Sequence, residues 1–246
     1  MNYKSVCHYK KYKLGCGFCN LPENGPNIKI SDLNEVIDAY LEEGNFNHFL
    51  IGGGSEEPSY NFEKIFKIIQ YIRSKSKKPI YLMSLPPSDT SILEQLYKDG
   101  LDEIAFNIEI FDRELAKKIM PGKGTLGLDR YLSALSHAVK LWGGHGAVRS
   151  LVILGLERDD TFLQGIETLC KMGVQPIVSI LRPMPNTPLA NKINPSNAYC
   201  KRMFDEISYI CKKYHQMLGP SCMYCQNNTL SLPFIAFKKY KTSSPI

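Results

Sequence analysis

The stretch "NHFLIGGG", residues 47–54, decides the fold class of this chain. An apolar run followed by three glycines is typical of a buried strand that ends in a tight turn. A helix is predicted after it, because apolar residues recur at helical spacing over residues 62–72 and Pro58 suits the first turn. One strand followed by one helix is the repeating unit of a parallel sheet.

The same alternation of strand and helix extends over most of the chain. Further strands are predicted at residues 78–84, 101–110, 147–157 and 174–182, with a weaker one at 3–7. Further helices are predicted at residues 91–100, 127–144, 160–173 and 195–218. This order predicts an α/β fold, a partial (β/α)6 TIM-like barrel over residues 1–218 with a short cysteine-containing extension at 219–246. In such folds the chemistry takes place at the carboxyl ends of the strands.

The composition is that of a globular protein with a sizeable core, since 43% of the 246 residues are hydrophobic. No apolar run reaches the roughly 20 residues that cross a membrane, and the first residues do not form a secretory signal. We therefore expect a cytoplasmic protein without a membrane partner. Thiols stay reduced in that compartment, so the eight cysteines indicate metal binding, catalysis or simple burial.

The net charge of +6 makes the surface mildly basic, with lysine groups at residues 10–13, 75–78 and 238–241. A basic surface attracts anions. We interpret these groups as solvated surface, because no nucleic-acid-binding motif accompanies them. A nucleic-acid partner is therefore not expected.

Polar residues and glycines gather where the predicted strands end. A Gly-Gly-Gly-Ser run at residues 52–55 follows one strand, and Asn107 and Glu109 close another. Side chains two apart on a strand share a face, so Asn107 and Glu109 are expected to point the same way. Arg149 lies in a later strand and Arg182 ends the last one. We expect all of these groups to converge on one mouth of the barrel.

Taken singly, each of these residues has an ordinary explanation. A glycine-rich turn need not bind a ligand, and Asn107 could cap a turn. Arg149 could form an ion pair with a carboxylate such as Glu157. The combination is therefore the observation that favours a functional site.

Three cysteines, Cys7, Cys16 and Cys19, lie close together near the start of the chain. A structural zinc site takes four ligands in a closed tetrahedron, and a [4Fe–4S] cluster is usually held by four cysteines. Three cysteines therefore leave one position open, where an iron could bind and activate a small molecule. His8 lies among them and is interpreted as a surface residue.

Five stretches resemble those of one family, in the same order and at the same strand ends. They are "CGFC" at residues 16–19, "IGGG" at 51–54, Asn107 with Glu109, "VRSLVILGLE" at 148–157 and "LRPMPNTPLA" at 181–190. Together they resemble the radical S-adenosylmethionine (radical SAM) superfamily, near its biotin synthase and lipoyl synthase branch. Two features depart from the family pattern: the first cysteine gap is C-x8-C in place of C-x3-C, and Ser55 stands where an acidic residue usually follows the glycines.

The resemblance implies a set of site residues and cofactors. Cys7, Cys16 and Cys19 would hold a [4Fe–4S] cluster whose open iron binds S-adenosylmethionine. The residues implied to contact S-adenosylmethionine are Phe18 at the adenine, Gly52, Gly53, Gly54 and Ser55 at the amino group, Asn107 and Glu109 at the ribose, Arg149 at the carboxylate, and Arg182.

The resemblance also implies a reaction and partners. Reductive cleavage would give a 5′-deoxyadenosyl radical that takes hydrogen from an unactivated carbon of a small molecule or an acyl-carrying protein. The electron would come from an external donor such as ferredoxin or flavodoxin.

The C-terminal extension carries a second metal-like pair, Cys222-x-x-Cys225. Cys211 is a weaker candidate to join it, whereas Cys200 and Cys170 are interpreted as core residues. An auxiliary iron–sulfur cluster at this pair would suit sulfur insertion in cofactor biosynthesis, as in a two-protein lipoyl synthase with a partner radical SAM subunit.

Two alternatives remain open at this point. The chain could be a radical SAM dehydrogenase, rearrangement enzyme or methyl transferase without sulfur insertion. Alternatively, Cys16 and Cys19 could join Cys222 and Cys225 in one zinc site that clasps a non-catalytic binding module.

Overall fold

The computed structural model describes the whole chain except residues 58, 61, 145, 221, 223–227 and 232–246. Within the described residues, six parallel strands form one sheet in chain order from β1 to β6. The strands are β1 (Asn2–Lys4), β2 (Phe49–Gly53), β3 (Ile80–Ser84), β4 (Glu103–Phe106), β5 (Val148–Leu154) and β6 (Gln175–Ile180). The helices are α1 (His8–Lys11), α2 (Ile30–Glu43), α3 (Glu63–Lys75), α4 (Ser91–Lys98), α5 (Arg113–Ile119), α6 (Pro121–Gly124), α7 (Leu128–Trp142), α8 (Asp159–Lys171) and α9 (Asn197–Lys213).

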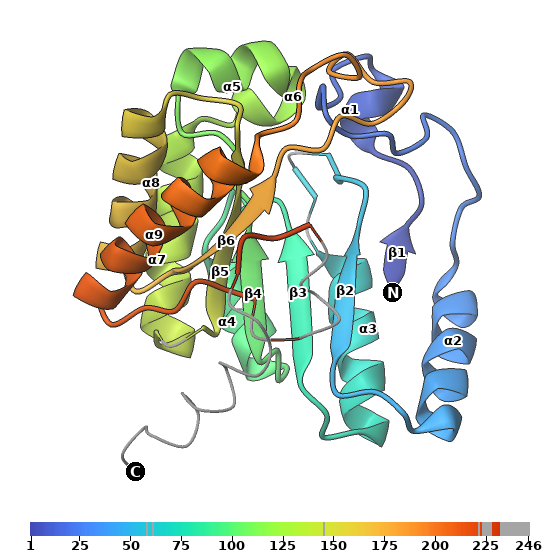
Figure 1. Ribbon diagram of the computed structural model, residues 1–246. Helices are drawn as coiled ribbons and strands as arrows, with labels where there is room; N and C mark the ends of the chain where they lie inside the picture. Colours follow the sequence, from blue (N-terminus) through green and yellow to red (C-terminus); the bar gives the residue numbers. More distant parts are fainter. Residues whose placement is uncertain (58, 61, 145, 221, 223–227, 232–246) are drawn as a thin grey trace.

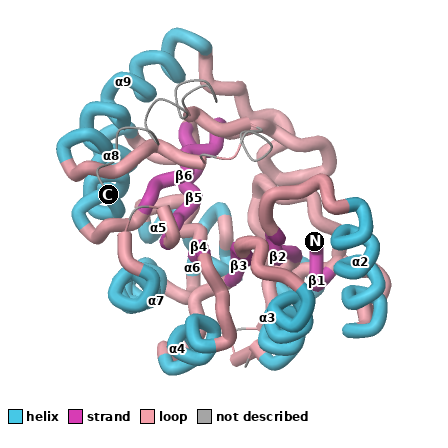
Figure 2. Tube along the Cα trace, turned by 90° about the horizontal axis from the view of Figure 1, so that it is seen from below, coloured by secondary structure: helices cyan, strands magenta, loops and turns pink. Residues whose placement is uncertain are grey.

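The strands form an arc, and the longer helices lie along its outer side (Figures 1 and 2). The core lies between these two layers, and the strand residues that face it are fully buried: Ile51, Leu82, Ile104, Val152 and Val178. Burial on both faces is typical of parallel strands that are covered by crossover helices. The arrangement confirms the predicted partial barrel, and it brings the carboxyl ends of all six strands to one edge. No described helix is long and apolar enough to cross a membrane.

The described part of the C-terminal extension covers the outer edge of β6. The N–H of Gly219 donates to the carbonyl of Pro176 near the start of that strand (3.0 Å). At the other end the N–H of Ile180 donates to Asn228 (3.0 Å). An edge strand presents unpaired backbone groups, so this contact satisfies several of them.

Several elements differ from those predicted from the sequence. Helix α2 was not predicted, although Ile30, Leu33, Ile37 and Leu41 recur at helical spacing; of its fourteen residues only Leu33 and Ile37 are buried. The short helices α1, α5 and α6 were not predicted either. The remaining differences are at element ends: β1 ends at Lys4, β4 ends at Phe106, α3 begins at Glu63 and α9 ends at Lys213.

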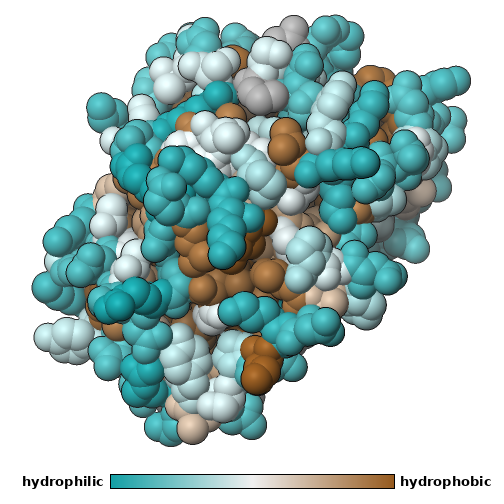
Figure 3. Space-filling view, turned by 90° about the horizontal axis from the view of Figure 1, so that it is seen from above, coloured by the Kyte–Doolittle hydropathy of each residue, from teal (hydrophilic) through white to brown (hydrophobic). Residues whose placement is uncertain are grey.

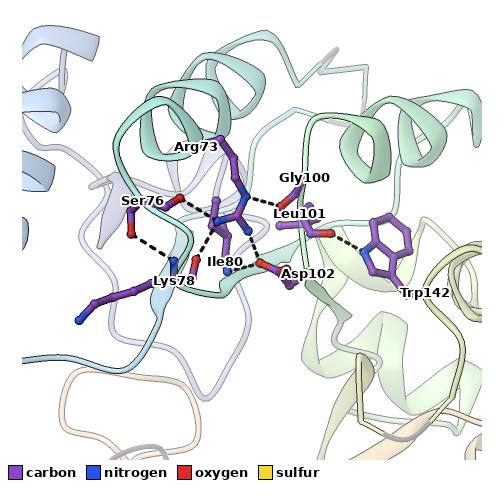
Figure 4. Close-up of polar contacts among 8 residues, drawn as sticks. All are labelled: Arg73, Ser76, Lys78, Ile80, Gly100, Leu101, Asp102 and Trp142. Atoms are coloured by element: carbon purple, nitrogen blue, oxygen red, sulfur yellow. Dashed lines mark hydrogen bonds and ion pairs between the residues drawn. The ribbon is translucent and has the colours of Figure 1, made fainter.

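A polar network around Arg73 holds the amino-terminal edge of the sheet (Figure 4). The Arg73 guanidinium donates from Nε to the carbonyl of Gly100 and from Nη1 to that of Lys78, both at 2.8 Å. It also pairs with Asp102, whose carboxylate accepts from the N–H of Ile80 (2.7 Å). One side chain of α3 therefore joins the residues that precede β3 and β4.

We expect Arg73→Met to lower the free energy of unfolding by about 2 kcal/mol, because hydrogen bonds from a charged group contribute roughly 1.5–3 kcal/mol and several are lost together. Urea unfolding measures this change. Arg158→Met is the matched control, since Arg158 forms only an exposed ion pair with Asp160. Equal unfolding midpoints for Arg73→Met and wild type would show that the network adds no stability.

Candidate functional site

A pocket opens at the carboxyl ends of the strands, on the face seen in Figure 3, where a hollow with apolar residues is surrounded by hydrophilic ones. All three amino-terminal cysteines, Cys7, Cys16 and Cys19, line it. Six further residues predicted from the sequence also line it: Phe18, Gly53, Gly54, Ser55, Asn107 and Glu109. Gly52 is buried inside β2 and does not line the pocket. The structure therefore brings together most of the residues that the strand ends predicted.

The loop that carries the cysteines is fixed by backbone hydrogen bonds to three other segments. The N–H of Gly17 donates to Ile119 at the end of α5 (2.7 Å), and the carbonyl of Gly17 accepts from Leu189 (3.1 Å). The N–H of His8 donates to Ser55, directly after the glycine run (2.9 Å). These anchors hold the loop over the pocket although it contains only the four-residue helix α1.

The three thiols are free and face a common cavity. Burial raises the pKa of the Cys16 thiol, and the nearby Glu109 carboxylate raises it further. A thiol in this position becomes a thiolate when positive charge, such as that of a metal, is bound beside it.

The spacing of the three thiols can be compared with what a single zinc ion and an iron–sulfur cluster each require. No three His, Cys, Asp or Glu side chains of the described residues lie close enough to hold a single metal ion. In a zinc site every sulfur lies about 2.3 Å from one ion, whereas in a cluster each cysteine binds its own iron. Thiols spaced around one cavity therefore fit an iron–sulfur cluster better than a zinc ion.

The glycine run at the end of β2 is required by close backbone packing. A Cβ atom on Gly54 would lie 2.2 Å from the carbonyl oxygen of Val6 and 2.7 Å from the N atom of Cys7. Gly53 has a φ of +148°, which favours glycine, and its Cβ would lie 2.5 Å from the Lys4 carbonyl oxygen. The run therefore lets β2 approach the first cysteine whether or not a ligand is bound.

We expect Gly54→Ala to displace Cys7, and to lower the free energy of unfolding by roughly 1–3 kcal/mol, as overpacked sites do. Iron content after reconstitution and thermal unfolding report the two effects. The control is Gly144→Ala, because its Cβ would meet only the carbonyl oxygen of Gly173, at 3.6 Å. If both variants load iron and unfold like wild type, the close approach has no consequence for the site.

Lys123 is a pocket residue that the sequence did not single out. Its Nζ lies 2.7 Å from the Glu109 carboxylate and 3.2 Å from the carbonyl oxygen of Asn107. The Lys123 side chain is 10% exposed and the Glu109 side chain is 13% exposed, so the ion pair is largely shielded from water. Burial lowers the pKa of Lys123, but attraction to Glu109 and other nearby groups outweighs it, and the net pKa is raised.

The backbone at Glu109 is unusual and is held from both sides. Glu109 has a φ of +66°, which few residues other than glycine adopt. Its N–H donates to Leu151 and its carbonyl accepts from Ile153, both at 2.9 Å. The Asn107 side chain also accepts from the N–H of Leu151 (3.1 Å). Strand β5 thereby fixes the backbone of Glu109 and the side chain of Asn107 after β4 has ended.

Arg149 and Arg182 do not line the pocket. Arg149 is the second residue of β5 and pairs with Glu103, the first residue of β4, at 2.7 Å, and with Gln175, the first of β6, at 3.1 Å. The expectation that Arg149 joins the mouth is therefore wrong, because its position early in the strand places it at the opposite edge. The ordinary explanation, an ion pair with a carboxylate, is confirmed, but the partner is Glu103 and not Glu157. Arg182 follows β6 at the correct edge but is exposed.

The remaining described cysteines do not line the pocket. Cys170 and Cys211 are buried between α8 and α9, with their sulfurs 3.9 Å apart, so Cys211 is part of the core. Cys200 is half-buried on α9 and packs against that core, as predicted. Cys222 is half-buried and does not line the pocket. Cys225 lies outside the described residues.

Comparison with known proteins adds a family and a fold. The family model described as the Radical SAM superfamily matches residues 6–186. A bacteriochlorophyllide c C-7(1)-hydroxylase from Chlorobaculum limnaeum is 27% identical over 130 residues, which are 52% of this chain and 32% of the hydroxylase.

Two solved structures share the fold. SuiB from Streptococcus suis, bound to S-adenosylmethionine, matches with a TM-score of 0.68 and 16% identity, over 86% of this chain and 47% of SuiB. The FeFe-hydrogenase maturase HydG from Carboxydothermus hydrogenoformans gives the same TM-score at 16% identity, over 89% of this chain and 52% of HydG. The matches therefore cover about half of these structures and about a third of the hydroxylase.

Proposed function

The chain belongs to the radical SAM superfamily, and from that premise we propose that it binds a [4Fe–4S] cluster through Cys7, Cys16 and Cys19 and cleaves S-adenosylmethionine reductively. The observation that carries this proposal is the single pocket that all three thiols share with the end of β2 and with Asn107 and Glu109. A cluster held by three cysteines keeps one iron free for the amino and carboxylate groups of S-adenosylmethionine.

A cluster held by Cys7, Cys16 and Cys19 would supply the electron for reductive cleavage of S-adenosylmethionine to methionine and a 5′-deoxyadenosyl radical, and that radical would take a hydrogen from a substrate carbon. The chain's own residues position the reactants. We assign Asn107 and Glu109 to the ribose hydroxyls, and Phe18 to the adenine. Phe18 suits that role because it lines the pocket and packs on the apolar cluster of Ile110, Ala116 and Met120.

Gly53, Gly54 and Ser55 would present backbone groups to the amino end of S-adenosylmethionine. Enclosure by these elements excludes water from the reacting atoms. With Arg149 at the opposite edge, the carboxylate needs another cation, and Lys123 is the buried cation that lines the pocket.

The test is anaerobic reconstitution with iron and sulfide, followed by metal counts and an assay of 5′-deoxyadenosine with S-adenosylmethionine and dithionite. We expect about four irons at the proposed site and 5′-deoxyadenosine that depends on both additions. Tightly bound zinc without iron and without 5′-deoxyadenosine would overturn the proposed function.

The sulfur-insertion reaction is the finer proposal, and it rests on the pair Cys222 and Cys225 alone. Loss of about four further irons in the Cys222→Ala/Cys225→Ala variant, with 5′-deoxyadenosine formation retained, would support a separate auxiliary cluster as sulfur source. An iron content equal to that of wild type would argue against an auxiliary cluster and would favour a dehydrogenation, rearrangement or methyl transfer.

A further inference from the structure

The loop between the proposed ligands carries positive charge that the site itself does not use. Residues 1–22 contain four lysines and no acidic residue. Lys4 is held in an ion pair, and Lys10 lines the pocket. Lys11 and Lys13 are exposed, and no carboxylate of the described residues forms an ion pair with either. Both lie within six residues of a proposed cluster ligand.

Two neighbouring segments extend this charge. Gly17 hydrogen-bonds to Ile119 and to Leu189, so the end of α5 and the segment before α9 lie against the loop (Figure 1). The first segment presents Lys118 and the second presents Lys192, and both are exposed. The lysine surface is defined here by its four exposed cations: Lys11, Lys13, Lys118 and Lys192.

Exposed apolar side chains accompany these lysines. Tyr12 is 57% exposed, Leu14 is 44% exposed and Ile193 is 88% exposed. Tyr12 and Leu14 belong to the loop, and Ile193 follows Lys192. Apolar and aromatic residues among charged ones are the composition of a protein–protein interface with a polar rim.

Resting on the proposed function, we propose that the lysine surface docks the protein that reduces the cluster, an acidic one-electron carrier of the flavodoxin or ferredoxin class. Each reductive cleavage consumes one electron, which the carrier gives up as it is oxidised and S-adenosylmethionine takes up as its carbon–sulfur bond breaks. Docking on the loop that bears the ligands would bring the carrier's redox centre close to the cluster. Opposite charge would steer the encounter and make it sensitive to salt.

The test measures binding of reduced flavodoxin to the reconstituted protein and to a variant with the lysine surface neutralised. The variant is Lys11→Gln/Lys13→Asn/Lys118→Gln/Lys192→Gln. Asparagine is used at residue 13 because φ is +59° there and asparagine tolerates that backbone. The matched control neutralises four exposed lysines at the other end of the barrel: Lys77, Lys98, Lys140 and Lys212.

We expect flavodoxin affinity to fall at least tenfold in the first variant at low salt and less than twofold in the control. Cleavage driven by flavodoxin should fall with the affinity, whereas cleavage driven by dithionite should stay at the wild-type rate. Equal flavodoxin affinity for wild type and the first variant would overturn the docking proposal. A second result would also overturn it: wild type binds a single-stranded RNA more tightly than it binds flavodoxin, in a salt-dependent way, and the first variant does not bind that RNA.

Binding is scored separately from cleavage. Failure to form 5′-deoxyadenosine with dithionite would count against the proposed function, while the docking surface would still be decided by the affinity. The iron content of the variant should equal that of wild type, which would show that the substitutions act on docking and leave the cluster in place.

Discussion

A Cys16→Ala variant will not retain the [4Fe–4S] cluster and will form no 5′-deoxyadenosine above background. Cys16 is the most constrained of the three ligands, since the adjacent Gly17 is hydrogen-bonded on both sides and the Cys16 side chain packs on the Ile110 cluster. Apart from the three proposed ligands, no described cysteine lines the pocket, so none can replace Cys16. We expect bound iron to fall from about four atoms to near zero, as measured by iron and sulfide analysis and by electron paramagnetic resonance of the reduced protein.

Cys200→Ala is the matched control for this loss. Cys200 is free, half-buried and outside the pocket, so its variant should bind iron and cleave S-adenosylmethionine like wild type. Circular dichroism should show that both variants fold. If Cys16→Ala keeps its iron and its activity, the cluster lies elsewhere, and the assignment of Cys7 and Cys19 is also lost.

The sequence could predict those features that local chemistry determines. Strand and helix periods are set by burial, so the alternation along the chain gave the partial barrel, and the glycine run marked the place where β2 approaches Val6 and Cys7. Asn107 and Glu109 do line one pocket, although β4 ends at Phe106. They converge because hydrogen bonds from β5 hold the chain beyond the end of β4. The two-residue period of a strand predicted the same result, but a strand is not the cause at these residues.

The features that the sequence could not predict depend on where elements begin and on contacts between distant segments. Arg149 was expected at the mouth, but it is the second residue of β5, and its side chain reaches Glu103, the first residue of β4, at the opposite edge. Lys123 lies in an unpredicted short helix, and its partner is fourteen residues earlier. The one available signal was its position between two glycines: a Cβ at Gly122 would lie 2.2 Å from Tyr9, and one at Gly124 would lie 2.7 Å from Ala116.

Replacing Lys123 with methionine will destabilise the fold and weaken S-adenosylmethionine binding together. The change leaves the Glu109 carboxylate largely buried without its cation, which typically costs about 3–5 kcal/mol. Without Lys123 the Glu109 side chain also loses the contact that holds it at the pocket, where it would accept from the ribose hydroxyls, so affinity should fall as well. Urea unfolding and calorimetric titration of the reconstituted protein measure the two effects.

The pH dependence and a double variant separate the ion pair from other roles of Lys123. In wild type the raised pKa of Lys123 means that the stability it contributes is full from neutral pH up to the usual lysine pKa, about 10.4, and is lost as the pH rises beyond that value. Lys123→Met/Glu109→Gln should recover most of the stability, because no buried charge remains, but not the affinity. Full stability in the single variant would instead show that Glu109 is adequately solvated without Lys123, and that the pair does not hold the ribose-binding side chain.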